Sequence, residues 1–284
     1  MLRKFIIGTE WLYYKVYTGV VTSDIILVEH LQPVITKLLK ENIISEWFFI
    51  RYKDNDTHLR IRFKLVEIKD LGIVIEYFKN IFTPLLSNNL IHNVCVDTYN
   101  REIERYGINN IECSEKLFYY SSELVLWSIS NEKEQDRWIY TIKIIDEFLN
   151  KFDYTLSEKK QLMSLMNDSF GREFNVDSYK RKVLSEKYKE KENRIADYIE
   201  NLSEEDPFFF IFQKFKKDSE KNILTIKRNL GANIDDKHNY MFSLIHMQCN
   251  RCFRSKQRLN EWVVYNLMFQ YYRGKLAREI KVYR

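Results

Sequence analysis

Hydrophobic and polar residues alternate strictly between positions 58 and 65 of this 284-residue chain. Because successive side chains of a β-strand point to opposite faces, this alternation predicts a strand with one apolar face. The opposite face would carry His58, Arg60, Arg62 and Lys64. The aromatic-rich run 47–52 precedes this strand across a five-residue polar turn, so the two segments are predicted to pair as a hairpin.

The cationic strand face has two interpretations. Same-face residues of a strand lie about 6 to 7 Å apart, so three cations repel one another unless anions neutralise them. A charged outer face is common on half-exposed sheets, and this is the structural interpretation. The functional one is a site for carboxylate or phosphate. Arg in place of Lys favours such a site, because the planar guanidinium matches these anions.

Apolar spacing predicts further elements around the hairpin. A strand lies within 10–21, and a helix capped by Ser23 or Asp24 follows it. A second helix, capped by Asp70, is expected to end near Pro84, and 91–98 returns as a strand. The order β-α-β-β-α-β is that of a ferredoxin-like split βαβ sheet, so the predicted fold class is α+β.

Helical periodicity dominates the rest of the chain. The predicted helices are 117–130, 136–152, 157–168, 177–202, 207–230, 238–253 and 259–272. Since no Gly/Ser-rich linker separates the two parts, a single domain is expected. Its sheet half would be 1–107, its helical half 108–284, with a ligand cleft between them.

Composition narrows the class of protein. Gly (7) and Pro (3) are scarce, which favours long regular elements. No apolar run reaches the roughly 18 to 20 residues of a membrane span, so a cytoplasmic protein is expected. Cys249 and Cys252 form a C-x-x-C pair that lacks a second pair of ligands, so buried packing is favoured over a metal or redox site.

Positive charge gathers at the C-terminal end. Residues 251–284 hold nine Lys or Arg and two Glu, a net charge of +7 in a chain of net charge +5. This stretch is either a solvated, ion-paired helix face or a surface for an acidic peptide. Direct nucleic-acid binding is not expected, because the sequence holds no zinc finger, RRM motif or block of consecutive basic residues.

Two further segments place polar residues where the core would be apolar. In the first, 99–107, Tyr99, Glu102 and Arg105 follow the last predicted strand. In the second, Ser243, His246 and Asn250 form a polar stripe along an otherwise apolar helix, and Asn250 could orient the imidazole of His246. One imidazole with several arginines suits proton transfer on a substrate that carries or releases carboxylates.

These motifs together resemble one known family. The hairpin 47–62, the segment 99–107 and the helix 243–251 are similar to the C-terminal domain of lantibiotic dehydratases, also called the thiopeptide-type bacteriocin biosynthesis domain. No large region precedes them, so a stand-alone form of that domain is expected. The resemblance implies maturation of a ribosomal precursor peptide, without cofactor or metal, beside a partner glutamylation enzyme.

Two reactions are open to such a domain. One is elimination of glutamate from glutamylated Ser or Thr, which leaves dehydroalanine or dehydrobutyrine. The other is the pyridine synthesis of thiopeptide pathways, which joins two dehydroalanines and releases the leader peptide. Elimination has more use for several arginines and is therefore the favoured function. A non-catalytic peptide-binding subunit is the third hypothesis.

The residues divide into two predicted roles. His246, Arg62 and Arg105 are the predicted catalytic residues, since a base and carboxylate partners are what elimination requires. The predicted substrate-binding residues are Arg60, His58, Tyr99, Glu102, Ser243, Asn250 and Arg251.

Overall fold

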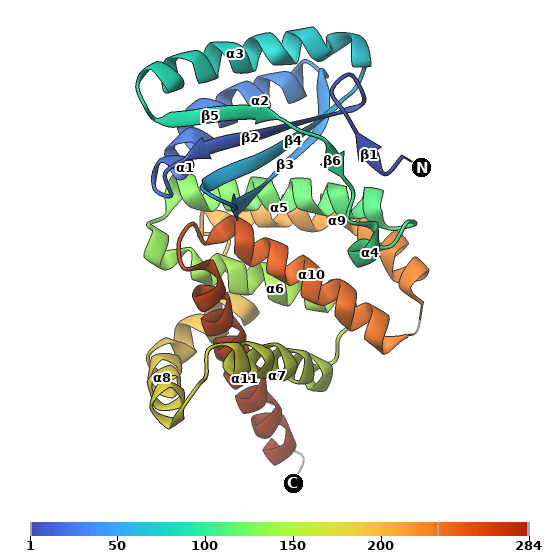
Figure 1. The fold of residues 1–284 in the computed structure, drawn as a ribbon. Coiled ribbons are helices and arrows are strands. Elements are labelled where there is room, and N and C mark those ends of the chain that lie inside the picture. Colours follow the sequence, from blue (N-terminus) through green and yellow to red (C-terminus); the bar gives the residue numbers. More distant parts are fainter. Residues whose placement is uncertain (1, 232, 283–284) are drawn as a thin grey trace. The chain divides into compact units, whose positions relative to one another are not determined.

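The computed structural model describes residues 2–231 and 233–282 (Figure 1). The chain divides into two compact units, and each is described by itself. The sheet unit comprises Met1–Glu132 and Lys214–Asn229. The helical unit comprises Lys133–Gln213 and Leu230–Arg284.

Antiparallel strands form the centre of the sheet unit. The main sheet has the order β3-β4-β2-β5. Its strands are β2 (Trp11–Thr18), β3 (Ile44–Lys53), β4 (Thr57–Leu65) and β5 (Ile91–Val96). A second sheet pairs β1 (Lys4–Phe5) with β6 (Tyr99–Asn100), two short strands that the sequence pattern did not predict. Strands and helices occur together with antiparallel pairing throughout, so the predicted α+β class is confirmed.

Helices follow β2 and β4, which are the first and third strands of the main sheet along the chain. Between β2 and β3 lie α1 (Thr22–Ile25), the π-helical turn η1 (Ile26–Leu31) and α2 (Gln32–Lys40). A 3₁₀ turn η2 (Ile68–Asp70) leads into α3 (Leu71–Ser87), and α4 (Ile103–Tyr106) and α5 (Ile111–Asn131) follow β6. In Figure 1, α2 and α3 lie on one side of the sheet and α5 on the other.

The predicted hairpin is present, and its apolar face is part of the core. Leu59, Ile61 and Phe63 of β4 are each at most 1% exposed. The ring of Phe63 stacks on Phe78 of α3 with centroids 4.5 Å apart. Alternation in the sequence thus predicts which side chains of β4 are buried against helices.

Local side chains account for three differences from the predicted elements. Neither Ser23 nor Asp24 caps a helix, because both accept hydrogen bonds from the guanidinium of Arg51, at 2.6 Å each. Asp70 is at the N-cap position of α3, but its side chain makes no capping hydrogen bond. Helix α3 continues past Pro84 to Ser87, since Pro84 removes one donor while its own carbonyl still accepts from the Asn88 amide at 3.0 Å.

The sheet unit is larger than the 1–107 half that we expected. Helix α5 belongs to it because Phe118 packs edge-on against Phe48 of β3, with centroids 5.4 Å apart. In addition, the Ser122 hydroxyl accepts a hydrogen bond from the Phe49 amide at 3.4 Å. A boundary drawn at the last strand therefore misses the helix that covers the outer strand of the sheet.

All the helices predicted after position 108 are present, with shifted ends. In the helical unit they are α6 (Trp138–Lys151), α7 (Leu156–Glu173), α8 (Ser178–Glu200), α10 (Ile234–Cys252) and α11 (Gln257–Val282), preceded by the 3₁₀ turn η3 (Glu134–Asp136). Helix α9 (Phe208–Leu230) is shared by the two units. In the described residues, no helix combines the length and apolar character that crossing a membrane requires.

Candidate functional site

His58 and Arg62 of β4 each lie between aromatic residues of the two neighbouring strands. Strand register places Tyr13 of β2 and Phe48 of β3 directly opposite Arg62, and Tyr17 and Tyr52 opposite His58. Both neighbouring strands alternate in phase with β4, so their same-face residues flank its cations. The side of the sheet that we expected to be charged is therefore largely aromatic and partly buried.

Arg62 occupies the most enclosed position in this row. It is 7% exposed, and its guanidinium carbon lies 4.5 Å from the Tyr13 ring centroid, 5.2 Å from Phe48 and 4.8 Å from Tyr99. No hydrogen bond or ion pair holds this group in the part of the chain that the structure describes, and its buried Nε has no partner. Burial lowers the pKa of Arg62, so the site destabilises the cation that it holds.

Arg60 lies two residues before Arg62 on the same face of β4, and its guanidinium has other partners. Its guanidinium stacks 3.4 Å from the Tyr52 ring centroid, and its Nε donates to Nε2 of His58 at 3.2 Å. Nδ1 of His58 lies 3.1 Å from the Asp56 carbonyl, which can only accept, so Nδ1 carries the proton. Burial lowers the pKa of His58, which favours this neutral form. His58 is enclosed, so we revise its predicted role from binding substrate to positioning Arg60.

Tyr99 joins the Arg62 environment to a buried ion pair. Its hydroxyl donates to Glu115 at 2.7 Å, while its ring faces Arg62. Glu115 is fully buried and accepts two hydrogen bonds from Arg101, at 2.8 and 2.7 Å. Tyr99 is itself 4% exposed, so it forms a wall of the site and its hydroxyl is already occupied.

Glu102 and Arg105 are placed outside this enclosed region. They form an ion pair at 3.1 Å one helical turn apart, and about half of each side chain is exposed. The ring of the next residue, Tyr106, packs edge-on against Phe118 of α5, with centroids 5.0 Å apart. Among the described residues no ion pair or hydrogen bond links the surroundings of Arg105 to Arg62, so the predicted catalytic role of Arg105 stays a prediction.

His246 has a partner that the sequence did not reveal. Its Nδ1 lies 2.9 Å and 3.1 Å from the two carboxylate oxygens of Glu261, a residue of α11 that is 1% exposed. Gln257 and Tyr265 also donate hydrogen bonds to this carboxylate. Because a carboxylate accepts, Nδ1 donates to it, and in the neutral form of the ring Nε2 carries the lone pair. Glu261, not Asn250, therefore orients the imidazole.

The other polar residues of α10 differ in their burial and in their hydrogen-bond partners. Ser243 donates to the Asn239 carbonyl of its own helix at 3.2 Å, and Asn250 is half-buried. Arg251 is 1% exposed, and its predicted role in substrate binding stays a prediction. The helix thus presents His246, 28% exposed at its side chain, as its accessible imidazole.

The C-x-x-C pair is part of the core. Cys249 and Cys252 are both free thiols and at most 2% exposed, and burial raises the pKa of Cys249 well above its ordinary value. Within residues 2–231 and 233–282, no three His, Cys, Asp or Glu side chains lie close enough together to hold a metal ion.

Four of the nine cations in the basic C-terminal stretch form ion pairs. The last two residues of this stretch, 283 and 284, lie outside the described residues. The four cations pair with acidic residues of α7, α8 and η3: Arg254 with Glu134, Arg258 with Glu173, Lys275 with Glu200, and Arg278 with Glu192. Pairing on this scale favours the interpretation as a solvated helix face and weakens that of a peptide-binding surface.

Two chemical groups result from this geometry. In the sheet unit, Arg60 and Arg62 offer cations to an anionic ligand against aromatic walls. In the helical unit, His246 and Glu261 form a dyad suited to accepting a proton at Nε2. The expected cleft between the two halves stays a prediction.

Comparison with known proteins agrees with this pattern. Residues 11–272 match the family described as lantibiotic biosynthesis dehydratase C-term, and the chain belongs to this family. The resemblance drawn from the three sequence motifs is thereby confirmed. The subtilin biosynthesis protein SpaB of Bacillus subtilis is 24% identical over 94% of this chain. The chain spans 27% of the length of that relative.

Two solved structures share the fold. The tRNA-dependent lantibiotic dehydratase MibB from Microbispora sp. 107891 matches 98% of this chain and 29% of its own, with a TM-score of 0.74 and 18% identity. The pyridine synthase TbtD from thiomuracin biosynthesis matches 93% of this chain and 97% of its own, with a TM-score of 0.62 and 11% identity. At these identities the likeness is one of fold.

Proposed function

We propose that this protein eliminates glutamate from glutamylated Ser or Thr residues of a ribosomal precursor peptide. The observation that carries the proposal is the buried guanidinium of Arg62, which has aromatic walls and no carboxylate partner among the described residues. An unneutralised buried cation is costly, and an anionic substrate would offset that cost. A glutamyl ester supplies such a carboxylate.

The reaction assigns a separate role to the dyad. His246 takes the α-proton at Nε2, the Cα–H electron pair forms the Cα=Cβ bond, and the Cβ–O bond breaks. Glutamate leaves as a carboxylate, and Arg60 and Arg62 bind its anionic groups. Glu261 stabilises the imidazolium that forms. The donor of the glutamyl group is a partner glutamylation enzyme.

Pyridine synthesis is the second candidate, suggested by the fold shared with TbtD. That reaction needs two dehydroalanines held close together. Dehydroalanine side chains carry no carboxylate, so a buried arginine has no anionic group to bind. The arginine row of β4 therefore favours elimination.

We also propose that the main sheet is ferredoxin-like. Its strand order β3-β4-β2-β5, with helices after β2 and β4, supports this proposal.

Mass spectrometry distinguishes the candidates. Precursor peptide is incubated with the protein once in glutamylated and once in already dehydrated form. Loss of glutamate is expected for an eliminase, loss of leader with ring formation for a synthase, and binding without either product for a non-catalytic subunit. In the first assay, His246→Ala should lower the single-turnover rate by about 10²- to 10⁴-fold, as removal of a general base does. A His246→Ala variant that binds more weakly but keeps the wild-type single-turnover rate would reduce His246 to an anchor.

A further inference from the structure

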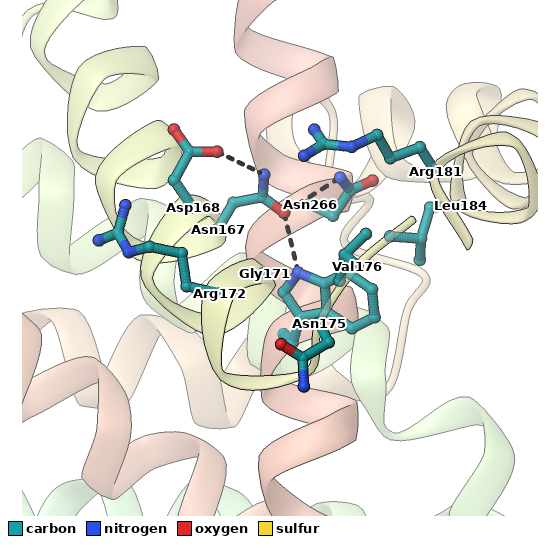
Figure 2. A pocket seen from close by; sticks show the side chains of 10 residues that line it. Asn167, Asp168, Gly171, Arg172, Asn175, Val176, Arg181, Leu184 and Asn266 are labelled. Atoms are coloured by element: carbon teal, nitrogen blue, oxygen red, sulfur yellow. Dashed lines mark hydrogen bonds between the residues drawn. The ribbon is translucent and has the colours of Figure 1, made fainter. Parts of the chain in front are cut away.

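A pocket of about 590 Å³ opens in the helical unit, where the end of α7, the start of α8 and the side of α11 meet (Figure 2). This volume is typical of ligand-binding pockets. Asn167 and Arg172 come from α7, Arg181 from α8, and Trp262 and Asn266 from α11. None of these residues takes part in the elimination proposed above.

A hydrogen-bonded ladder holds the floor of the pocket. The side-chain oxygen of Asn167 accepts from Trp262 Nε1 and from Asn266 Nδ2, each at 3.1 Å. Asn266 in turn accepts from Gln270 at 2.7 Å. Trp262 is 5% exposed, and its ring packs on Phe174 with centroids 5.7 Å apart. The floor is thus preformed, which lowers the entropic cost of binding.

Two exposed arginines line the pocket: in Figure 2 the Arg181 side chain extends toward Asn266, whereas the Arg172 guanidinium extends away from the Asn167–Asn266 pair. Neither Arg172 nor Arg181 forms an ion pair or side-chain hydrogen bond within the described part of the chain. Other arginines of this unit do pair: Arg194 with Asp136, Arg254 with Glu134, Arg258 with Glu173, and Arg278 with Glu192. The pocket therefore holds two cations that form no ion pair with any of the described acidic residues, Asp168 of the lining included.

We propose that this pocket binds an acidic segment of a peptide. Arg172 and Arg181 would clamp its carboxylates, since the guanidinium fork matches them in bidentate geometry. The exposed side-chain amide of Asn175, which lines the same pocket, is suited to the peptide backbone. The choice of a peptide as ligand rests on the proposed function, whereas the choice of an acidic one rests on the two arginines.

Charge and exposure favour a short acidic peptide over nucleic acid. The described lining holds two arginines against one carboxylate, that of Asp168, so its net charge is +1. Nucleic-acid channels combine a longer row of cations with exposed aromatic faces on which bases stack. Trp262, the aromatic residue of the lining, is too buried to offer such a face.

The pocket shares a helix with the His246 dyad. Glu261, which orients His246, directly precedes Trp262 in α11. Consecutive helical residues are turned by about 100°, so one face of α11 supports the imidazole while the next forms the pocket floor. A peptide segment anchored here would be held by the same helix that positions the proposed base.

Fluorescence anisotropy tests the site without any chemistry. The probe is a labelled ten-residue peptide of alternating Asp and Gly, compared with its Asn-Gly counterpart. Arg172→Glu and Arg181→Glu should each weaken binding of the Asp peptide by about tenfold, because each reverses a charge at a charge-assisted contact. Lys189→Glu is the matched control, since this exposed lysine of α8 lies outside the lining and should change affinity by less than about twofold.

Several outcomes would overturn the proposal: no binding of the Asp peptide, equal binding of the Asn peptide, or an equal loss in the Lys189→Glu control. Competition by an oligothymidylate with the same dependence on Arg172 and Arg181 would assign the pocket to nucleic acid. Arg172→Gln and Arg181→Gln, checked by circular dichroism, replace any Glu variant that fails to fold. Because glutamate elimination is not measured, failure of the proposed function would leave these results unaffected.

Discussion

Two buried arginines on either side of Tyr99 have opposite surroundings. Arg101 donates two hydrogen bonds to the buried carboxylate of Glu115, which also accepts from the Tyr99 hydroxyl. Arg62 faces the ring of Tyr99 together with Phe48 and Tyr13, and no carboxylate forms an ion pair with it among the described residues. Both side chains are less than 10% exposed.

The difference separates a structural arginine from one suited to a ligand. For Arg101, charge attraction and hydrogen bonds offset the cost of burial. For Arg62, the aromatic faces supply cation–π attraction and leave the guanidinium N–H groups without acceptors. The charge of Arg101 is thus neutralised by a carboxylate of the fold, while that of Arg62 is available to a substrate carboxylate.

Replacement of each arginine by Met tests this contrast most strongly. Arg101→Met leaves the Glu115 carboxylate buried without its cation and should cost about 3 to 5 kcal/mol of unfolding free energy. Arg62→Met removes a buried charge that has no partner, so stability should change by less than about 1 kcal/mol, or rise. Urea unfolding of both variants measures the difference. Equal destabilisation by the two substitutions would show that Arg62 is structural as well.

The second prediction concerns another buried carboxylate, Glu261. Glu261→Gln keeps the size of the side chain but removes the charge that orients and stabilises the imidazole of His246. Loss of such a supporting interaction typically costs about 10- to 100-fold, so the single-turnover elimination rate should fall by that factor while substrate affinity is retained. Glu173→Gln, which removes an exposed partner of Arg258, is the control. A wild-type rate in Glu261→Gln would mean that the dyad is not used.

A smaller effect is expected at the exposed arginine, Arg105. Its ion pair with Glu102 is half exposed, and such pairs contribute about 0.2 to 1 kcal/mol. A contact between the exposed Arg105 and a substrate carboxylate should contribute no more than such a pair, so Arg105→Ala should lower the elimination rate by about fivefold or less. Arg62→Lys should be far slower than wild type because the planar fork is lost. Parallel single-turnover assays compare them. If Arg105→Ala is the slower variant, Arg105 and not Arg62 is the main anchor of the substrate carboxylate.

The smallest predicted effect is a pH dependence from His58. Burial lowers the pKa of His58 in the folded protein, so the unfolded chain takes up a proton at higher pH. The free energy of unfolding should therefore fall as pH drops below the ordinary histidine value of about 6.5. His58→Gln should make this decline shallower, leaving the part due to His238, whose pKa burial also lowers. Urea unfolding at pH 7 and pH 5.5 measures both slopes, and identical slopes would contradict the assignment.

Much of the fold could be predicted from spacing alone. The alternation from His58 to Leu65 gave the strand, its apolar face and the position of Arg60 and Arg62, because a strand face depends only on local geometry. The helical half followed from apolar periodicity in the same way. Ser23 and Asp24 were misassigned as caps because their partner, Arg51, is distant in sequence.

The partners of the site residues could not be predicted, since they depend on tertiary packing. Glu261 lies fifteen positions after His246, on a different helix, and no local pattern links the two. The buried pairing of Arg101 with Glu115 gave no signal either, although Arg101 lies in the segment chosen as a motif. Aromatic residues opposite Arg62 were visible in β2 and β3, but the register that aligns them requires the paired strands.

A single-turnover comparison of wild type with Arg62→Met shows whether Arg62 binds a substrate carboxylate. Glutamylated precursor peptide is mixed with excess wild-type protein or Arg62→Met, and mass spectrometry follows each peptide through a single turnover. Wild type should release one glutamate for each dehydrated residue, while Arg62→Met, folded and of near wild-type stability, should leave the glutamylated peptide to accumulate. Equal release of glutamate by both proteins would contradict this role of Arg62.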